Sequence, residues 1–168
     1  CKFYEIEPII CTTIHQSDDV LQEISEKKGV KYFRGSEINK IKRWTECAEK
    51  FKLQSFHTID ADDPFFDGDE VKKSMNLLNK KKYDIIFPSE ESSNGLASVG
   101  FSIKSKAISK LYEKYSGNID TEYIWEFIND FPSLNCCRLE NNNYKKTIVR
   151  LTLDYLEDYE MLNLLRQK

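Results

Sequence analysis

Several features that would assign this chain of 168 residues to a class of protein are missing. No apolar run approaches the length of about 20 residues that a membrane-spanning helix requires, so we expect no membrane partner. Only two histidines occur, His15 and His57, too few for a histidine-rich metal site, and we interpret His57 as a packed strand residue. The five cysteines form no CxxC pair. An odd number without framework spacing predicts reduced thiols in a cytoplasmic protein.

The sequence also lacks an excess of positive charge. Its formal net charge is -3, so we expect no nucleic-acid partner and no general affinity for an anionic membrane. Hydrophobic residues make up 40% and charged residues 32%, the balance of a folded globular protein rather than a disordered one. A chain of this length favours one domain, which we place over residues 1–168.

Strand-like and helix-like segments alternate through the first half of the chain. Short apolar runs typical of buried strands lie near residues 7–14, 30–33, 55–59 and 83–87. Between them, apolar side chains recur at the spacing of one helix face, as in Ile41, Trp44 and Ala48. This alternation predicts an α/β fold with a mostly parallel, Rossmann-like sheet, whose ligands bind beyond the carboxyl ends of the strands.

The regular alternation of strand-like and helix-like segments ends at Pro88. We interpret residues 89–132 as a smaller lobe, either covering the site or contacting another subunit, with a strand near 96–101 and two helices. A final strand is expected over residues 147–153, followed by a last helix that carries Leu162.

Acidic residues gather directly after the expected strand at 55–59, at Asp60, Asp62 and Asp63. Crowded carboxylates repel one another, and a cation offsets this repulsion. Oxygen ligands at a strand end suit magnesium or manganese, which in turn suit phosphate chemistry. The alternative is a solvated acidic turn before a helix that Asp67 or Asp69 caps.

A second acidic run follows the expected strand at 147–153, with Asp154, Glu157 and Asp158. If this strand lies beside the one at 55–59, Asp154 and Asp62 converge on one cation and leave it open to further ligands. Alternatively, Asp154 is the N-cap of the last helix and Glu157 completes a capping box. Capping by Asp158 instead would leave Asp154 for the metal.

The order of these segments resembles the cytidylyltransferase family that makes CMP-activated acidic sugars, including the CMP-acylneuraminate and CMP-KDO synthetases and their spore-coat-polysaccharide relatives. Short motifs in the family's order carry the resemblance across nearly the whole chain. They are Ile9–Thr13 with Asp18 and Asp19, G-V-K-Y-F-R-G-S at 29–36, D-D-P at 62–64, T-E-Y-I at 121–124, and R-L-T-L-D-Y-L-E-D at 150–158.

The resemblance implies a nucleotide-diphospho-sugar transferase fold with a dimerisation lobe, and transfer of CMP from CTP to an acidic sugar. It implies that Asp62 and Asp154 are the catalytic residues and bind magnesium (or manganese). Asp63, Asp158 and Arg150 are expected to steady these two carboxylates. The implied partners are CTP and an acidic sugar, and the implied assembly is a homodimer.

The resemblance also implies substrate contacts. The sugar is expected at Glu122 and Gly95. Arg34 is expected either to contact the nucleotide or to form a surface salt bridge. The full set of expected nucleotide-binding residues is Thr12, Thr13, Arg34 and Ser36.

The chain departs from the family at several positions. The basic, glycine-containing loop that grips the triphosphate in the family is absent, so we expect either that an N-terminal part precedes Cys1 or that this is a degenerate copy. Tyr123 replaces the usual histidine and Leu156 the usual proline. Two other functions therefore stay open: a metal-dependent glycosyltransferase using Asp60-Ala61-Asp62, and a non-catalytic subunit or interaction module.

Overall fold

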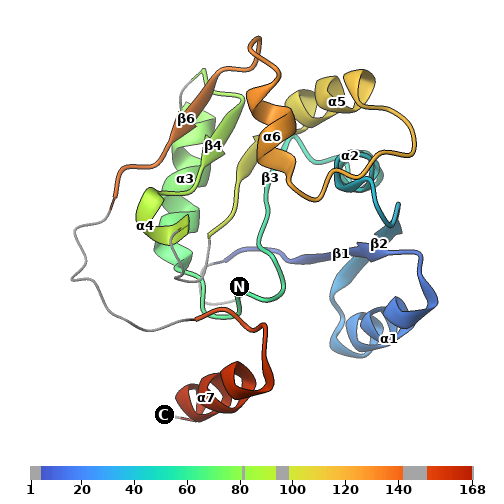
Figure 1. Ribbon diagram of the computed structural model, residues 1–168, viewed down its shortest axis with the longest axis vertical. Coiled ribbons are helices and arrows are strands. Elements are labelled where there is room, and N and C mark those ends of the chain that lie inside the picture. Colours follow the sequence, from blue (N-terminus) through green and yellow to red (C-terminus); the bar gives the residue numbers. More distant parts are fainter. Residues whose placement is uncertain (1–4, 81, 94–98, 142–150, 168) are drawn as a thin grey trace. The chain divides into compact units, whose positions relative to one another are not determined.

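The computed structural model describes residues 5–80, 82–93, 99–141 and 151–167. The chain forms two compact units, each built from two stretches of sequence. Figure 1 labels the helices and strands of both units. Unit 1 comprises residues 1–56 and 104–135, and unit 2 comprises residues 57–103 and 136–168. Within the described residues, no helix is long and apolar enough to cross a membrane. The predicted single domain with a smaller lobe over residues 89–132 stays a prediction.

Unit 1 contains two parallel strands joined through a helix. β1 (Ile9–Thr13) pairs with β2 (Lys31–Gly35) along its whole length, so that the carboxyl ends of both strands meet at Thr13 and Gly35. The connection runs through the 3-10 helix η2 (Gln16–Asp18) and α1 (Asp19–Lys28). α1 ends at Gly29, whose φ of +65° is a left-handed conformation that glycine adopts readily.

Three further helices complete unit 1: α2 (Lys40–Lys50), α5 (Ser105–Lys114) and α6 (Ile124–Asn129). Their apolar faces are buried because hydrophobic residues recur at helical spacing, as at Ile41, Ile108 and Leu111. Asn39, whose side chain is fully buried, caps α2 by accepting the Lys42 amide at 2.8 Å.

Unit 2 is built around a short mixed sheet. β4 (Ile85–Phe87) pairs with β5 (Ser102–Lys104) in antiparallel and with β6 (Cys136–Arg138) in parallel orientation. Together with β3 (Ser55–His57), the strand order is β3-β5-β4-β6. α3 (Gly68–Lys80) contributes Leu78 to a buried cluster with Ile86 and Leu139. The short helix α4 (Glu90–Ser93) and the last helix α7 (Leu156–Arg166) also belong to this unit.

The predicted α/β class is confirmed, and most helices lie where the apolar spacing places them. Within the described residues, α1, α2, α3, α5, α6 and α7 match predicted helices, and the pairs β1–β2 and β4–β6 are parallel. The four cysteines that the structure describes carry free thiols, in agreement with the reading of the cysteine spacing.

Two predicted strands are wrong in the described part of the chain. The strand expected at 96–101 is displaced to β5, because Gly100 has a φ of +64°, which interrupts extended pairing. The final strand was expected over residues 147–153, but its described part, residues 151–153, is not a strand. The amides of Asp154 and Tyr155 both donate to the Asp158 carboxylate at 3.0 Å, so these donors begin a helix instead of a strand ladder.

Candidate functional site

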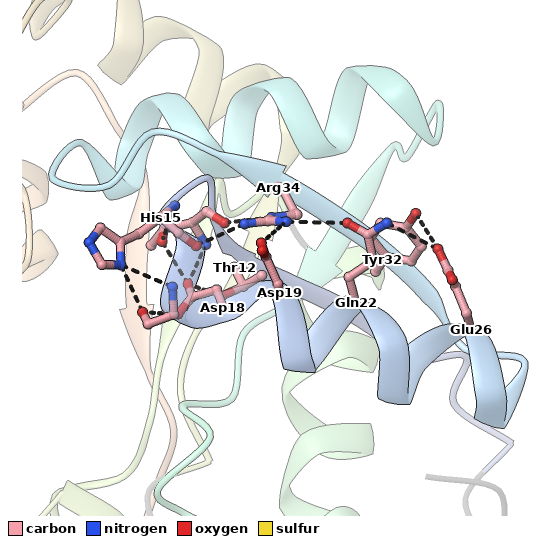
Figure 2. Close-up of polar contacts among 10 residues, drawn as sticks. Thr12, His15, Asp18, Asp19, Gln22, Glu26, Tyr32 and Arg34 are labelled. Atoms are coloured by element: carbon pink, nitrogen blue, oxygen red, sulfur yellow. Dashed lines mark hydrogen bonds and ion pairs between the residues drawn. The ribbon is translucent and has the colours of Figure 1, made fainter.

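The carboxyl end of β1 is closed by an acid that follows it. Asp18 Oδ2 accepts the hydroxyls of Thr12 and Thr13, each at 2.6 Å, and the Thr13 amide at 3.0 Å (Figure 2). These hydrogen bonds, led by the one from Thr12, hold the pKa of Asp18 well below its usual range. The two threonines expected to contact the nucleotide therefore use their hydroxyls to fix the β1–η2 turn.

Arg34, at the end of β2, reaches across to the same turn. Its Nη1 lies 2.6 Å from Asp19 Oδ1 in an ion pair, while Nε donates to the Thr13 carbonyl at 2.9 Å (Figure 2). Nη2 donates to the His15 carbonyl at 2.8 Å. The salt bridge considered from the sequence is thus present, and it holds the guanidinium beside the strand ends of unit 1.

A cavity of about 590 Å³ opens next to this arginine, a volume within the range of small-molecule sites. Arg34 and Ser36, two of the predicted nucleotide-binding residues, line it. The remaining walls combine apolar, charged and amide side chains, supplied by Ile14, Glu37, Ile38, Lys42, Glu46 and Asn118. The cavity therefore offers apolar surface, charges of both signs and an amide to one ligand.

Glu122, the predicted sugar-binding acid, is paired with a lysine of α2. Lys40 Nζ lies 2.8 Å from Glu122 Oε1, and the lysine stem is largely buried, with its ammonium group 5.8 Å from the centre of the Trp44 ring. The Glu122 side chain remains 64% exposed, so its carboxylate faces solvent on one side.

In unit 2, the two predicted metal-binding segments lie side by side. The Leu153 amide donates to the Asp62 carbonyl at 2.7 Å, which places residues 153–154 against residue 62. The side chains of Asp62 and Asp154 are both exposed. Asp158, rather than Asp154, accepts the amides at the start of α7, as in the alternative that leaves Asp154 for another role.

The other predicted residues of this region differ in their placement. Asp63 is buried, and its amide donates to the Asp60 carbonyl at 3.1 Å in a tight turn. Arg150 and Gly95 lie outside the described residues. No cluster of three or more histidine, cysteine or acidic side chains suited to a metal occurs in the part of the chain that the structure describes. A metal bound here would thus depend on two carboxylates and on substrate oxygens, as magnesium commonly does.

No family model matches the chain, but individual proteins do. An uncharacterized protein from Methanocaldococcus jannaschii is 29% identical over 156 residues, which cover 91% of this chain and 63% of that protein. The spore coat polysaccharide biosynthesis protein SpsF from Bacillus subtilis is 26% identical over 165 residues, which cover 95% of this chain and 67% of that protein.

Solved structures agree with these relatives. A cytidylyltransferase from Leptospira borgpetersenii matches 92% of this chain with a TM-score of 0.75 and 21% identity. The chain has a cytidylyltransferase fold. A 4-diphosphocytidyl-2C-methyl-D-erythritol synthase from Anaerococcus prevotii matches 98% of the chain with a TM-score of 0.67 and 17% identity. The chain spans just under two thirds of the first relative and of the first structure, 63% and 66% of their lengths.

These matches confirm the resemblance that the motifs indicate. Open α/β sheets in general bind ligands at the carboxyl ends of their strands. In this chain, Thr13 and Gly35 end β1 and β2 in unit 1, and residues 60–63 follow β3 in unit 2.

Unit 2 also contains a largely buried chain of polar contacts that the sequence did not reveal. His57 Nε2 donates to the Val99 carbonyl, and His57 Nδ1 lies 2.7 Å from Ser102 Oγ. Ser74 Oγ lies 2.7 Å from Ser102 Oγ. Because a carbonyl only accepts, Nδ1 carries no proton and accepts the Ser102 hydroxyl. Burial lowers the pKa of His57 to about 4, so the ring is neutral at pH 7. The predicted packed strand residue is thus present at the end of β3.

A second feature missed from the sequence lies behind the cavity of unit 1. Arg43 of α2 is buried, and its Nη1 donates to the carbonyls of Ser36 and Glu37 at 2.6 and 3.1 Å. A charged residue within an otherwise apolar helix face was the only signal available from the sequence.

Proposed function

We propose that this chain carries out cytidylyl transfer, moving CMP from CTP to an acidic sugar of the sialic-acid or KDO type. The products are a CMP-sugar and pyrophosphate, in the service of surface polysaccharide biosynthesis. Support comes from the cytidylyltransferase fold and from the relative named as a spore coat polysaccharide biosynthesis protein. We further propose a cytoplasmic homodimer, the assembly implied by the family resemblance.

One observation carries the proposal: the 2.7 Å hydrogen bond from the Leu153 amide to the Asp62 carbonyl. It joins two acidic segments that lie 92 positions apart in the sequence, at residues 62 and 154. Neighbouring exposed carboxylates at this point repel each other, and a shared divalent cation would offset the repulsion.

Asp62 and Asp154 fit magnesium (or manganese) as a pair of hard oxygen ligands that leaves most coordination positions to substrate. When bound, the metal would neutralise charge on the α-phosphate and favour the ionised form of the attacking hydroxyl. Asp158 supports this arrangement by holding the amides of Asp154 and Tyr155, which fixes the backbone that carries the Asp154 carboxylate. Asp63 and Arg150 are proposed to assist.

The cavity in unit 1 is the proposed place for the nucleotide. Its volume of about 590 Å³ suits a ligand of that size, and it is lined by Arg34 and Ser36. Thr12 and Thr13 shape the adjoining turn through their bonds to Asp18. Glu122 is proposed to accept hydroxyls of the sugar while Lys40 orients its carboxylate, and Gly95 is proposed as a further sugar contact.

In the proposed reaction, a sugar hydroxyl oxygen forms a bond to the α-phosphorus of CTP. The bond between that phosphorus and the bridging oxygen to the β-phosphate breaks, and pyrophosphate leaves with the electron pair. The hydroxyl proton passes to solvent. The protein contributes by positioning the reactants and by neutralising their charge rather than by forming a covalent intermediate.

A pyrophosphate-release assay tests this function with CTP, magnesium and a panel of sialic-acid-like and KDO-like acids. We expect release that requires both an acidic sugar and the metal. Hydrolysis of a UDP-sugar in place of CTP would favour a glycosyltransferase using Asp60-Ala61-Asp62. No binding of CTP with magnesium in a calorimetric titration would favour the non-catalytic module.

A further inference from the structure

Part of the wall of the cavity in unit 1 is formed by the end of β2 and the loop that leads to α2, residues 35–39. Gly35, the last residue of β2, lines the cavity together with Ser36, Glu37 and Ile38 of the loop. A loop without regular backbone pairing needs other groups to fix its shape. Two buried polar side chains supply such contacts: Asn39 anchors the end of the loop to the carbonyls of Tyr115 and Gly117, and Arg43 binds the loop itself.

Arg43 holds the loop from the side of α2. Its Nη1 donates to the Ser36 carbonyl at 2.6 Å and to the Glu37 carbonyl at 3.1 Å. Arg43 is only 8% exposed, and its side chain does not line the cavity. Arg43 therefore contacts the wall from behind, without facing the space that a ligand would occupy.

Stability alone does not account for a charge at this position. Within the described residues, no carboxylate forms an ion pair with Arg43, and its buried Nε has no hydrogen-bond partner. The guanidinium does interact with the Cys11 thiol and, after the hydrogen bond from Cys47, helps to lower the pKa of that group, but a thiol is a weak acceptor. A buried, incompletely paired cation destabilises a fold relative to an apolar side chain of similar size. What the guanidinium does provide is one nitrogen, Nη1, that donates to two successive carbonyls.

The direction of these carbonyls determines which groups the loop presents on its other face. All peptide bonds described are trans, so the N–H of each peptide points away from its carbonyl. With the Ser36 and Glu37 carbonyls directed at Arg43, the amides of Glu37 and Ile38 point away from it. Neither amide is hydrogen-bonded to any other residue that the structure describes.

Gly35 allows this close approach. A Cβ at this position would lie 2.7 Å from the Phe33 ring and 3.1 Å from Arg43 Cγ, so only glycine lets the arginine stem pass directly beneath the start of the loop.

We infer that Arg43 is a positioning residue for the proposed nucleotide cavity. It turns the Ser36 and Glu37 carbonyls towards α2, so that the amides of Glu37 and Ile38 face a ligand acceptor. The part concerning the ligand rests on the proposed function, whereas the effect on the loop does not.

Two amides report on the loop. The Asn39 amide donates to Ser36 Oγ at 3.2 Å, and the Thr121 amide donates to the Ile38 carbonyl at 3.1 Å. The Leu53 amide, bonded to the Ala48 carbonyl beyond the other end of α2, serves as the internal reference. Hydrogen exchange followed by NMR compares Arg43→Met and Arg43→Lys with the unmodified chain. Ile108→Val, a mild core truncation in α5, controls for general destabilisation.

Relative to Leu53, exchange at Asn39 and Thr121 should rise about tenfold or more in Arg43→Met, the effect of losing a charged hydrogen bond. Arg43→Lys should show an intermediate rise, because an ammonium group keeps the charge but lacks the fixed planar geometry that aims Nη1 at both carbonyls. Ile108→Val should leave the ratio unchanged. An unchanged ratio in Arg43→Met, or an equal rise in Ile108→Val, would overturn the inference.

A calorimetric titration with CTP and magnesium separates this inference from the proposed function. Affinity should fall about tenfold in Arg43→Met and remain in Ile108→Val. If the unmodified chain binds no CTP, the proposed function fails while the exchange ratios still decide the role of Arg43. If CTP binds equally to Arg43→Met and to the unmodified chain, the positioning role is wrong.

Discussion

The backbone amide of Leu153 donates a hydrogen bond to the carbonyl of Asp62, with 2.7 Å between nitrogen and oxygen. The acidic residue at position 154 is therefore held next to the one at position 62 by main-chain geometry. Asp158 contributes by taking the next two amides, those of Asp154 and Tyr155, and starting α7 there.

Removing either carboxyl charge should impair catalysis while leaving the fold intact. We expect Asp62→Asn and Asp154→Asn each to reduce pyrophosphate release by at least ~100-fold, the scale of losing one strong electrostatic contact. Asp69→Asn in the first turn of α3 is the matched control and should retain activity. Near-normal turnover in either variant would remove the metal-binding assignment.

Acid should destabilise the protein through His57. Burial lowers the pKa of this ring from 6.5 to about 4, so the unfolded chain takes up the proton at a higher pH than the folded protein. His57 therefore contributes stability that is fully present above pH 6.5 and is lost as the pH falls towards 4. At about 1.36 kcal/mol per pH unit, the loss is roughly 3 kcal/mol of unfolding free energy.

Urea unfolding at several pH values between neutral and acid measures this loss. His57→Gln keeps a donor for the Val99 carbonyl but cannot take up a proton, so its unfolding free energy should fall less steeply over the same interval. Carboxylates titrate equally in both proteins, which isolates the contribution of the ring. Equal slopes would show that His57 is not the group responsible.

Asp18 should stabilise the β1–η2 turn only while it is ionised. Hydrogen bonds from Thr12 and Thr13 lower the pKa of Asp18 below its ordinary 3.8. Its contribution is thus present above pH 3.8 and is lost as the pH falls further, towards the folded-state pKa. We expect Asp18→Asn to lower the melting temperature at neutral pH, whereas Glu23→Gln on α1, which removes the same charge, should not.

Two glycines with the same backbone conformation should respond differently to alanine. Gly29 and Gly100 have φ values of +65° and +64°, but a Cβ at Gly29 meets nothing within 4 Å, whereas one at Gly100 would lie 1.8 Å from the Thr58 carbonyl oxygen. Gly29→Ala should cost about 1–2 kcal/mol for the left-handed backbone alone. Gly100→Ala should cost roughly 3 kcal/mol or more because a clash adds to that strain. Similar losses in denaturant unfolding would contradict the clash.

Helices could be predicted from the sequence because their signals are local. Ile41, Trp44 and Ala48 recur on one face over several turns, and Gly29 marks the end of α1. β6, with only Cys136, Cys137 and Arg138, is too short for an alternating pattern to emerge, and its pairing with β4 depends on distant sequence. The conformation of residues 151–154 also depends on groups outside the segment, because the Leu153 amide donates to Asp62 and the Asp154 amide to Asp158 in α7.

The candidate site was predictable to the extent that motifs marked its residues. Asp62 and Asp154 could be named because acids follow apolar runs at both places, and the ends of these runs come together in the structure. A salt bridge of Arg34 was one of the two alternatives, but its partner Asp19 could not be predicted, and neither could the pairing of Glu122 with Lys40. Both depend on which side chains the fold brings within 4 Å. Arg43 was missed for the same reason.

Paramagnetic relaxation by manganese tests the shared cation most directly. In an NMR titration of Mn²⁺ with CTP present, two sets of signals should broaden together at the same metal concentration: those of residues 61–63 and those of Leu153 and Asp154. Asp154→Asn should abolish the effect at both segments. Broadening at one segment alone, or at both in the Asp154→Asn variant, would contradict a single ion held by Asp62 and Asp154.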